Sequence, residues 1–427
     1  MLDAGQALSV LHISHYDNYG GSARSAYKIH LGLRESGVRS KMLVGTKVTD
    51  DPDVARIHGN RRVLRCLDAV GTYIVDRLGW QYLFYPSSFT LAQHPWFQAA
   101  DVVQLYNIHG GFFSFEALPL LSRRRPIVWR LSDMWPLTGH CSYSYDCERW
   151  MNGCGTCPLL DEYPELSRDT TAFLWRRKRS AYKRSDLVIV TTNGWMEKLV
   201  SQSPLLGDYP RHCIPNGVDT KVFRPMSRHS ARDVLGVPKR AHAVLFAAHN
   251  TSAARKGGEI VPAVMAALVA RGVRDLVLIV VGEGAESWRT LRECPVLVNG
   301  LTNSDRLMAI FYSAADVLLC PTLAENLPNT VIESMACGTP VVAFEAGGVA
   351  EAVRHLQTGY LAGRGNVERL AEGVHMLLSD GGLHERLSAS CRRVAETEYA
   401  NEIQVRRFVE LYSSIKAQSA THQQRSA

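Results

Sequence analysis

The chain has 427 residues, enough for two or three domains that each bury a core of their own. Hydrophobic residues make up 46% of the sequence and charged residues 21%, which excludes a fibrous chain and a long disordered one. The formal net charge of +7 is compatible with an anionic partner, but it does not decide between nucleic acid, acidic lipid and a phosphorylated substrate.

Short apolar strands alternate with longer helical stretches along the chain, a pattern typical of parallel sheets covered by helices. The predicted strands of the first half are Leu8–Ile13, Lys41–Val44, Val102–Tyr106, Ile127–Leu131 and Leu187–Thr191. Those of the second half are Val244–Ala248, Leu276–Val281, Val296–Asn299, Val317–Cys320 and Pro340–Phe344. We therefore expect an α/β protein with two doubly wound, Rossmann-like domains.

A turn signal, Pro215-Asn216-Gly217, separates the two runs of strands. It divides the chain into a first domain, 1–214, and a second domain, 215–395. Ligands bind beyond the carboxyl ends of the strands in such sheets, so the expected site is a central cleft that both domains face. The last long helix is expected from about Leu383 to Ile415, and the remaining residues, 396–427, are expected to return to the first domain and end in a polar tail.

Loops at the predicted strand ends of the first domain carry candidate site residues. Gly20 and Gly21 open a helix after the first strand, where glycine lets the backbone approach a ligand closely. His109 and Asp133 each follow a strand and are candidates for contacts with a substrate. A structural role such as helix capping is an equal alternative for both.

The pair Asp51 and Asp53 forms an Asp-x-Asp motif of the kind that metal-dependent transferases place over the donor. Here the pair lies in a polar loop rather than at the end of a strand. We interpret it as a surface turn and predict no catalytic metal.

A cysteine-rich insert occupies residues 139–158 and closes with a Cys-x-x-Cys motif. Its thiols are Cys141, Cys147, Cys154 and Cys157. This spacing is typical of zinc ligands, and a structural zinc would hold together a loop that lacks a core. A disulfide pair and four unliganded thiols are the alternatives, and a reducing compartment favours zinc.

Aromatic residues and six basic residues share the segment 175–184. On a helix they could face an anionic membrane surface or simply be solvated. Nothing in the motifs favours nucleic acid. No apolar stretch approaches the roughly 20 residues of a membrane span, and the first residues lack the pattern of a secretory signal. We expect a cytoplasmic protein, with a peripheral position on the inner face of the plasma membrane as the alternative.

The second domain contains two motifs suited to a diphosphate. Arg255 and Lys256 precede two glycines after a predicted strand, and two cations there could neutralise phosphate charge. Glu325 lies in a loop before a helix, with Pro328 in its first turn and Glu333 about one turn further. The helix start presents N–H groups to an anion. A simple capping box between Thr330 and Glu333 is the alternative.

The second of these motifs carries a family resemblance. Glu, seven residues, Glu and then Ala-Cys-Gly-Thr-Pro-Val-Val resembles the donor-site signature of the retaining GT-B glycosyltransferases of the "group 1" family. The resemblance implies that Glu325 binds hydroxyls of the donor sugar and Glu333 those of the ribose. It also implies that backbone N–H groups of the loop between them hold the diphosphate. The residues of that loop are Asn326, Leu327, Pro328 and Asn329.

The resemblance implies further contacts with the donor from Gly20, Gly21, Gly282 and Glu351, and stabilisation of the leaving diphosphate by Arg255 and Lys256. The chain departs from the family at two places, with Thr251 where an arginine is usual and Ser132 where a histidine is common. A subset that makes extracellular polysaccharide, the exopolysaccharide or colanic-acid type, carries a similar cysteine-rich insert.

The implied function is that of a retaining glycosyltransferase that needs no cofactor for catalysis. It would move a hexosyl group from a UDP- or GDP-sugar to a glycan or a polyprenyl-diphosphate-linked acceptor in surface polysaccharide synthesis. Two alternatives stay open. One is a catalytically silent subunit that binds sugar nucleotide, and the other is a disaccharide synthase or phosphorylase on the same scaffold.

Overall fold

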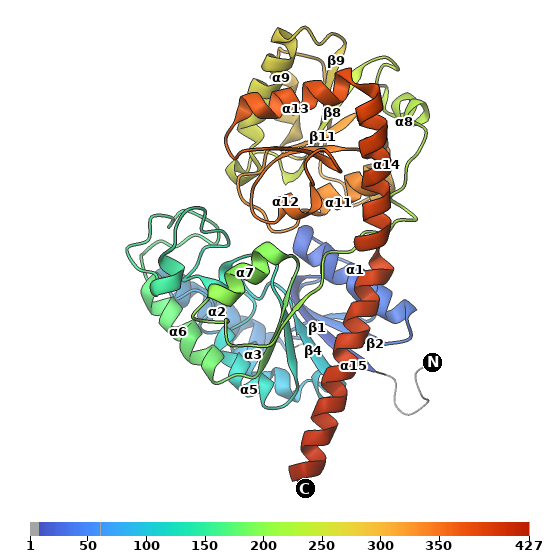
Figure 1. Ribbon diagram of the computed structural model, residues 1–427. Coiled ribbons are helices and arrows are strands. Elements are labelled where there is room, and N and C mark those ends of the chain that lie inside the picture. The colour runs from blue at the N-terminus through green and yellow to red at the C-terminus, as the bar shows by residue number, and fades with distance from the viewer. Residues whose placement is uncertain (1–7, 60, 427) are drawn as a thin grey trace. The chain divides into compact units, whose positions relative to one another are not determined.

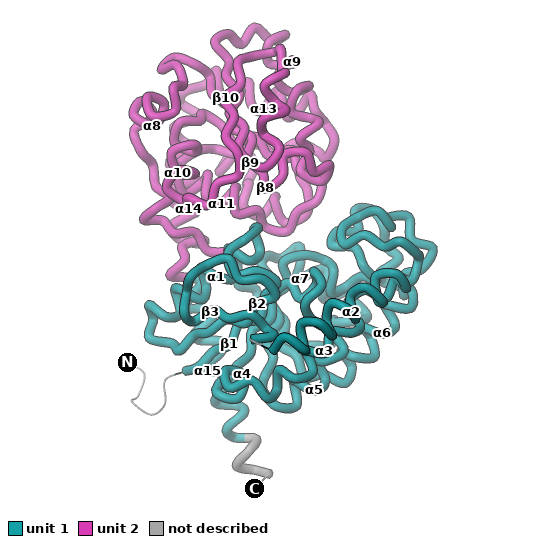
Figure 2. The backbone as a smooth tube through the Cα atoms, turned by 180° about the vertical axis from the view of Figure 1, so that it is seen from behind, with its two compact units in different colours: residues 1–215, 404–427 teal, residues 216–403 magenta. Residues whose placement is uncertain are grey.

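The structure, a computed structural model, describes residues 8–59 and 61–426. The chain divides into two compact units, the first formed by residues 1–215 and 404–427 and the second by residues 216–403 (Figure 2). Each unit is built on one parallel β-sheet with helices on both faces (Figure 1). Both sheets therefore have the doubly wound, Rossmann-like architecture that the alternating strands and helices predict.

The sheet of the first unit has seven strands in the order β3-β2-β1-β4-β5-β6-β7. Their bounds are β1 (Ser9–Tyr16), β2 (Arg39–Thr46), β3 (Val54–Arg56), β4 (Val102–Leu105), β5 (Ile127–Arg130), β6 (Leu187–Thr191) and β7 (Arg211–Cys213). Its helices are α1 (Gly21–Glu35), α2 (Arg62–Leu78), α3 (Pro86–Thr90), α4 (Pro95–Ala99), α5 (Leu118–Ser122), α6 (Thr171–Lys183), α7 (Gly194–Gln202) and most of α15 (Asn401–Ser426).

The sheet of the second unit has six strands in the order β10-β9-β8-β11-β12-β13. Their bounds are β8 (His242–Asn250), β9 (Leu276–Glu283), β10 (Val296–Asn299), β11 (Val317–Cys320), β12 (Val341–Phe344) and β13 (Gly359–Ala362). Its helices are α8 (Arg228–Leu235), α9 (Val261–Ala270), α10 (Asp305–Ala314), α11 (Asn329–Ala336), α12 (Val349–Ala352), α13 (Val367–Ser379) and α14 (Gly381–Glu398).

Apolar residues at successive strand positions pack into two separate cores, one on each face of the sheet, because side chains alternate between the faces of a sheet. In β1, Leu11 and Ile13 join the core beneath α5, α6 and α7, whereas Val10 joins the core beneath α1 and α15. The central strands β4 and β12 are buried along their whole length. Their near-continuous apolar sequences follow from this burial on both faces.

The C-terminal helix α15 packs on the sheet of the first unit, as its position after the last strand predicts. Phe408 and Tyr412 are fully buried against that sheet. The hydroxyl of Tyr412 donates a hydrogen bond of 2.8 Å to the side-chain carbonyl of Gln104, the one polar residue of β4. A buried amide that lacked this partner would destabilise the core, so α15 completes the first unit.

The prediction of one long helix from about Leu383 to Ile415 is wrong, because α14 ends at Glu398 and α15 begins at Asn401. The backbone between them pairs with Val218, whose N–H donates to the carbonyl of Tyr399 and whose carbonyl accepts from the N–H of Asn401. These bonds take the place of helical ones. The short edge strands β3, β7 and β13 were not predicted either, since three or four residues give too little alternation to recognise.

Candidate active site

A pocket lies at the carboxyl ends of β8 and β11 in the second unit. Its lining includes Phe246, Lys256, Cys320, Glu325, Pro328 and Thr330. The pocket therefore collects residues from the end of a strand, from the loops after β8 and β11, and from the start of α11. This is the edge of a parallel sheet where ligands are expected to bind.

The carboxylate of Glu325 joins the two loops. Its Oε2 atom accepts a hydrogen bond from Nη1 of Arg255 at 2.7 Å and a short one from the ammonium of Lys256. Arg255 also donates from Nη1 to the carbonyl of Ala324 at 2.8 Å. Two cations and one carboxylate thus share a mostly buried corner, and their formal charges sum to about +1.

Burial disfavours the charged form of the Glu325 carboxyl, but Arg255 and Lys256 favour it more strongly. Together they hold the pKa of Glu325 well below its usual range. The group is therefore a carboxylate at neutral pH. The side chains of Arg255 and Lys256 stay about a quarter exposed, at 28% and 23%, so both can still reach an anionic ligand from the solvent side.

Two glycines make this convergence of loops sterically feasible. A Cβ atom on Gly257 would lie 2.0 Å from the carbonyl oxygen of Pro321, and one on Gly347 would lie 2.0 Å from that of Glu325. Both residues have positive φ, a conformation that side chains disfavour. Gly348, next in the chain, donates its N–H to the carbonyl of Glu325 at 3.1 Å. Glycine is therefore required for the loops to touch.

The helix after Glu325 begins one residue later than predicted. Pro328 is the N-cap residue rather than a residue of the first turn, and its own side chain does not cap the helix start. Thr330 is the second helical residue, so the capping box with Glu333 is not formed. Asn216 fixes the preceding loop by donating to the carbonyl of Leu327 and to the side chain of Asn329, both at 2.9 Å.

The remaining donor-site candidates differ in how far they are buried. Glu333 is buried, and its Oε2 atom accepts a hydrogen bond of 3.1 Å from the hydroxyl of Tyr312. Glu351 is exposed on α12. Gly282 lies at the end of β9, where a Cβ atom would collide with the carbonyl of Ala248. Asn326 is buried in the loop after Glu325, and its N–H donates to Oε1 of Glu325 at 3.3 Å.

Thr251 has a structural role at the place where the resemblance leads one to look for an arginine. Its hydroxyl donates to the carbonyl of Glu283 at 2.9 Å and accepts a hydrogen bond from the indole N–H of Trp288 at 3.2 Å. These bonds tie the end of β8 to the end of β9. A guanidinium at the Glu325 carboxylate comes instead from Arg255, four residues further along the chain.

The first unit brings His109 and Asp133 together at its own strand ends. Nε2 of His109 lies 3.5 Å from Oδ2 of Asp133, and the same oxygen accepts from the side chain of Asn107 at 2.9 Å. The other oxygen, Oδ1, accepts the backbone N–H of Trp135 at 3.0 Å. Asp133 thus caps a short turn and also orients a histidine, so both proposed roles are compatible with one geometry.

Burial lowers the pKa of His109 to about 3, with a smaller effect from the ammonium of Lys178. His109 is therefore neutral at physiological pH. Sequence reasoning missed His15, at the end of β1, whose ring stacks on Phe112 with the centroids 5.3 Å apart. It also missed Lys178 as a buried residue. The Lys178 ammonium lies 3.5 Å from the centre of the Trp135 ring and donates to the carbonyls of Trp135 and Thr138.

The glycine loop after β1 joins the same edge of the first sheet. Gly20 is the N-cap of α1 and has a φ of 79°, and Gly21 is the first residue of that helix. The hydroxyl of Ser22 lies 2.9 Å from that of Ser132, the residue before Asp133. The loops that carry Gly20, Gly21 and Asp133 are therefore neighbours.

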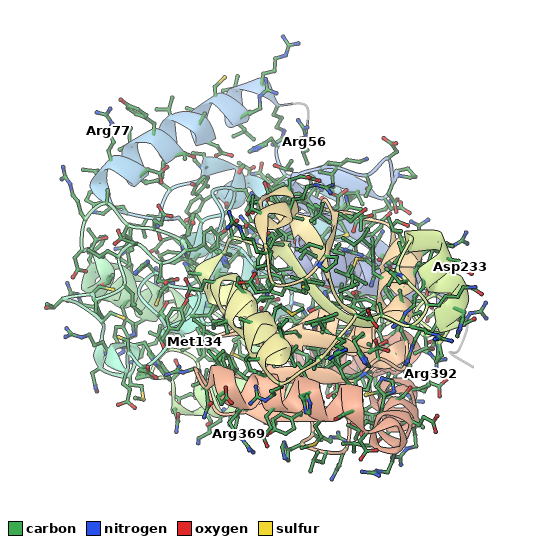
Figure 3. All side chains as sticks on the ribbon, turned by 90° about the horizontal axis from the view of Figure 1, so that it is seen from above. Arg56, Arg77, Met134, Asp233, Arg369 and Arg392 are labelled. Carbon is green, nitrogen blue, oxygen red and sulfur yellow. The ribbon has the colours of Figure 1, made fainter. Side chains whose placement is uncertain are left out.

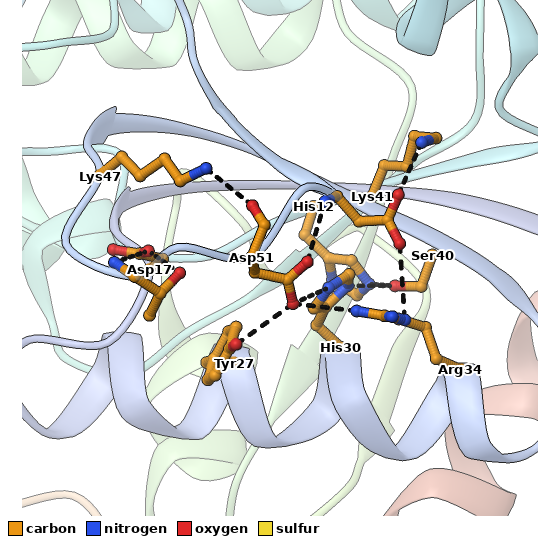
Figure 4. A network of polar contacts seen from close by, with 11 residues as sticks. His12, Asp17, Tyr27, His30, Arg34, Ser40, Lys41, Lys47 and Asp51 are labelled. Carbon is orange, nitrogen blue, oxygen red and sulfur yellow. Dashed lines mark hydrogen bonds and ion pairs between the residues drawn. The ribbon is translucent and has the colours of Figure 1, made fainter.

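The interpretation of Asp51 and Asp53 as a surface turn is wrong for Asp51, because its carboxylate is buried in a polar network (Figure 4). Its Oδ2 atom accepts from Arg34 at 2.9 Å and from the hydroxyl of Tyr27 at 3.2 Å. Asp53 accepts from Lys41 at 2.8 Å. The motif therefore holds α1 and β2 to the loop that precedes β3.

The cysteines of the insert gather around a small pocket in the first unit. It is lined by His140 and by the four thiols Cys141, Cys147, Cys154 and Cys157. All ten cysteines of the chain are free thiols. Among residues 8–59 and 61–426, no three histidine, cysteine or acidic side chains are arranged to hold a metal ion as they stand. Structural zinc stays a prediction.

Nothing in the described part of the chain is a helix with the length and apolar character needed to cross a bilayer. The basic helix α6 is less exposed than its sequence indicates. Trp175 and Lys178 are buried, and Arg177 and Arg184 both pair with Glu116. Several of the charged side chains of α6 therefore form contacts within the first unit.

Comparison with known proteins finds a family match within the second unit. Residues 241–380, which carry the pocket, match the family of Glycosyl transferases group 1. A D-inositol 3-phosphate glycosyltransferase from Saccharomonospora viridis is 31% identical over 227 residues, which are 50% of this chain and 52% of the relative. The chain spans about half the length of the curated relatives it matches.

Two solved structures resemble the whole chain. Sucrose-phosphate synthase from Thermosynechococcus elongatus has a TM-score of 0.67 at 18% identity and covers 96% of this chain and 99% of its own. HepE from Anabaena, solved with UDP-glucose, has a TM-score of 0.67 at 17% identity and covers 95% and 100%. At these identities the likeness establishes the fold, which is GT-B. Residues 241–380 thus resemble the group 1 glycosyl transferases, and the whole chain has the GT-B fold.

Proposed function

We propose that this chain is a retaining glycosyltransferase that moves a hexosyl group from a UDP- or GDP-sugar to a glycan or polyprenyl-diphosphate-linked acceptor. The observation that carries the proposal is the convergence of Arg255 and Lys256 on Glu325 beside the start of α11. The match of this region to group 1 glycosyl transferases supports it, as does the UDP-glucose bound by HepE, a structure of the same fold.

Charge and geometry explain how this corner would serve a nucleotide diphosphate. One carboxylate offsets only one of two cations, so a net positive charge of about +1 is left for phosphate oxygens. The N–H groups at the start of α11 add the positive end of the helix dipole. Both features stabilise the negative charge that develops on the leaving diphosphate, which is where electrostatic catalysis is most effective.

Glu325 would bind the hydroxyls of the donor sugar, and Glu333 those of the ribose. The paired cations hold Glu325 in its acceptor-only form, which can receive hydrogen bonds from hydroxyls. In the first unit, neutral His109 and the carboxylate of Asp133 are our candidates for contact with the acceptor or the sugar. No metal or other cofactor is assigned to the transfer. The protein would act by positioning both substrates and stabilising charge.

We place the enzyme in the cytoplasm and in the assembly of a surface or extracellular polysaccharide. The ten free thiols support a reducing compartment. The cysteine-rich insert supports the polysaccharide assignment, because the exopolysaccharide subset of the family has a similar one.

A donor screen tests the proposal. Purified protein is heated with UDP-, GDP- and ADP-sugars, since a ligand that binds the folded state raises its melting temperature. Lys256→Ala should weaken binding of the stabilising donor by about tenfold or more, the usual effect of losing a charge-assisted contact. Lys239→Ala is the matched control, because Lys239 is exposed on the same unit and pairs only loosely with Asp233, at 3.6 Å.

Turnover separates the enzyme from a silent binding subunit. With the stabilising donor and a lipid-linked or glycan acceptor, the chain should release nucleoside diphosphate, and the new bond should keep the anomeric configuration of the donor in an NMR spectrum. A donor that stabilises the protein but is never consumed would favour the binding subunit. An inverted product would refute the retaining mechanism.

A further inference from the structure

Helix α2 presents its large apolar side chains to solvent. Valine, leucine, isoleucine and tyrosine recur every three or four residues on one face, so they form a continuous strip along the helix. The strip consists of Val63 (71% exposed), Leu67 (47%), Val70 (58%), Tyr73 (60%), Ile74 (50%) and Leu78 (37%). A surface helix normally buries its apolar face against the core, whereas α2 exposes this face to solvent.

The opposite face of α2 carries the buried residues Asp68, Gly71 and Val75, and it is fixed to the body of the first unit. Buried Asp68 pairs with His58 at 2.9 Å and accepts the backbone N–H of Ser87 at 3.0 Å. A Cβ atom on Gly71 would lie 2.9 Å from the carbonyl oxygen of Phe84, so the helix touches that loop closely. These contacts prevent α2 from turning its apolar strip inward.

Arginines flank the apolar strip at both ends. Arg61, Arg62 and Arg65 are exposed around the start of α2, and Arg77 is exposed near its end, where its guanidinium lies 4.6 Å from the centre of the Tyr73 ring. Figure 3 shows α2 at the outer edge of the first unit, with Arg77 near one end and side chains that extend away from the ribbon.

We propose that α2 docks this protein on the surface of an anionic lipid bilayer. Its 17 residues form a helix about 26 Å long that would lie flat, with the apolar strip among the acyl chains and the arginines at the headgroups. Each arginine near such a surface contributes to binding. A second copy of the chain is a poorer occupant, because Asp76 is the only exposed acid on α2 and the arginines of two copies would repel.

This surface differs from the one that the sequence suggested. The basic segment 175–184 lies on α6, where Glu116 pairs with Arg177 and Arg184. By contrast, α2 combines exposed cations with exposed apolar area, which is the combination that an interfacial helix needs.

Co-sedimentation with lipid vesicles tests the proposal on the full-length protein. The wild type should bind vesicles of phosphatidylcholine and phosphatidylglycerol and bind pure phosphatidylcholine much less. The double variant Leu67→Glu/Ile74→Glu should lower the partition coefficient by about tenfold or more, since two exposed apolar side chains lose their burial in lipid. Val234→Glu is the matched control, because Val234 is 68% exposed on α8 of the second unit.

Two outcomes would overturn the proposal. The first is a wild-type protein that does not bind anionic vesicles, including the case in which light scattering shows a dimer that the double variant abolishes. The second is a double variant that binds vesicles as the wild type does. The result is independent of the donor site, because both variants should keep their melting temperature and their stabilisation by nucleotide sugar.

Discussion

The guanidinium Nη1 of Arg255 and the carboxylate Oε2 of Glu325 are 2.7 Å apart, although 70 positions of sequence separate the two residues. The bond joins the loop after β8 to the loop after β11, and Lys256 joins the same oxygen. Because the site is assembled from distant segments, its stability and its ligand binding depend on the same few side chains.

Replacing Glu325 by glutamine should destabilise the protein at pH 7 by about 1–3 kcal/mol, because two cations lose their buried partner. The pKa of Glu325 is lower in the folded state than in the unfolded one. Its contribution is therefore complete above the unfolded pKa of about 4.3 and is lost as the pH falls below it. Urea unfolding at several pH values should show that the difference between wild type and Glu325→Gln shrinks below about pH 4.5.

The control for this experiment is Glu368→Gln, since Glu368 pairs with Arg271 while 73% exposed. An exposed pair contributes about 0–1 kcal/mol, so this variant should stay close to wild type. Equal losses in the free energy of unfolding from Glu325→Gln and Glu368→Gln would contradict the view that the contacts of Glu325 with Arg255 and Lys256 stabilise the site.

Alanine at Gly257 should weaken donor binding and destabilise the second unit, because the new Cβ atom would lie 2.0 Å from the carbonyl of Pro321. Gly272→Ala separates this clash from backbone strain. Gly272 has a similar positive φ of 83°, but no atom lies within 4 Å of its Cβ position. We expect about 1–2 kcal/mol from φ alone in Gly272→Ala and clearly more in Gly257→Ala, measured by thermal unfolding. Similar melting temperatures for both variants would show that the loop relaxes freely.

The ten main strands and the residues around Glu325 could be predicted because their signals are local. Continuous apolar runs mark buried strands, and a glycine or proline marks where each helix starts or stops. The break between α14 and α15 could not be predicted, because it depends on the pairing of residues 399–401 with Val218, far away in sequence. The burial of Asp51 and Lys178 could not be predicted for the same reason, since charged residues give no local sign that distant partners will cover them.

His109 should make the first unit sensitive to mild acid. Its pKa is about 3 in the folded state, against about 6.5 when unfolded, so only the unfolded state takes up the proton between these values. Each pH unit below about 6.5 then removes about 1.4 kcal/mol of stability. Burial lowers the pKa of His12, His15 and His30 as well, so His109→Gln should remove only its own share of the acid sensitivity between pH 7 and pH 5.5. His229→Gln, on the exposed surface of α8, controls for the removal of an imidazole. Equal acid sensitivity in wild type and His109→Gln would refute the buried neutral histidine.

The cysteine pocket offers a direct chemical test of zinc binding. Four thiols and His140 line one small cavity, but their sulphurs would have to rotate toward its centre to share an ion. Protein purified under reducing conditions should carry about one zinc per chain by mass spectrometry, the stoichiometry of a tetrahedral structural site. Cys154→Ser/Cys157→Ser should lose the metal and unfold at a lower temperature, because binding energy of a structural zinc is folding energy.

Cys213→Ser is the control for that experiment, since Cys213 is exposed on β7 and does not line the pocket. Its zinc content should equal that of the wild type. A wild-type protein free of zinc would end the metal hypothesis and leave four packed thiols, whose removal should then affect stability only through lost contacts. Loss of zinc from Cys213→Ser as well would place the ion elsewhere in the chain.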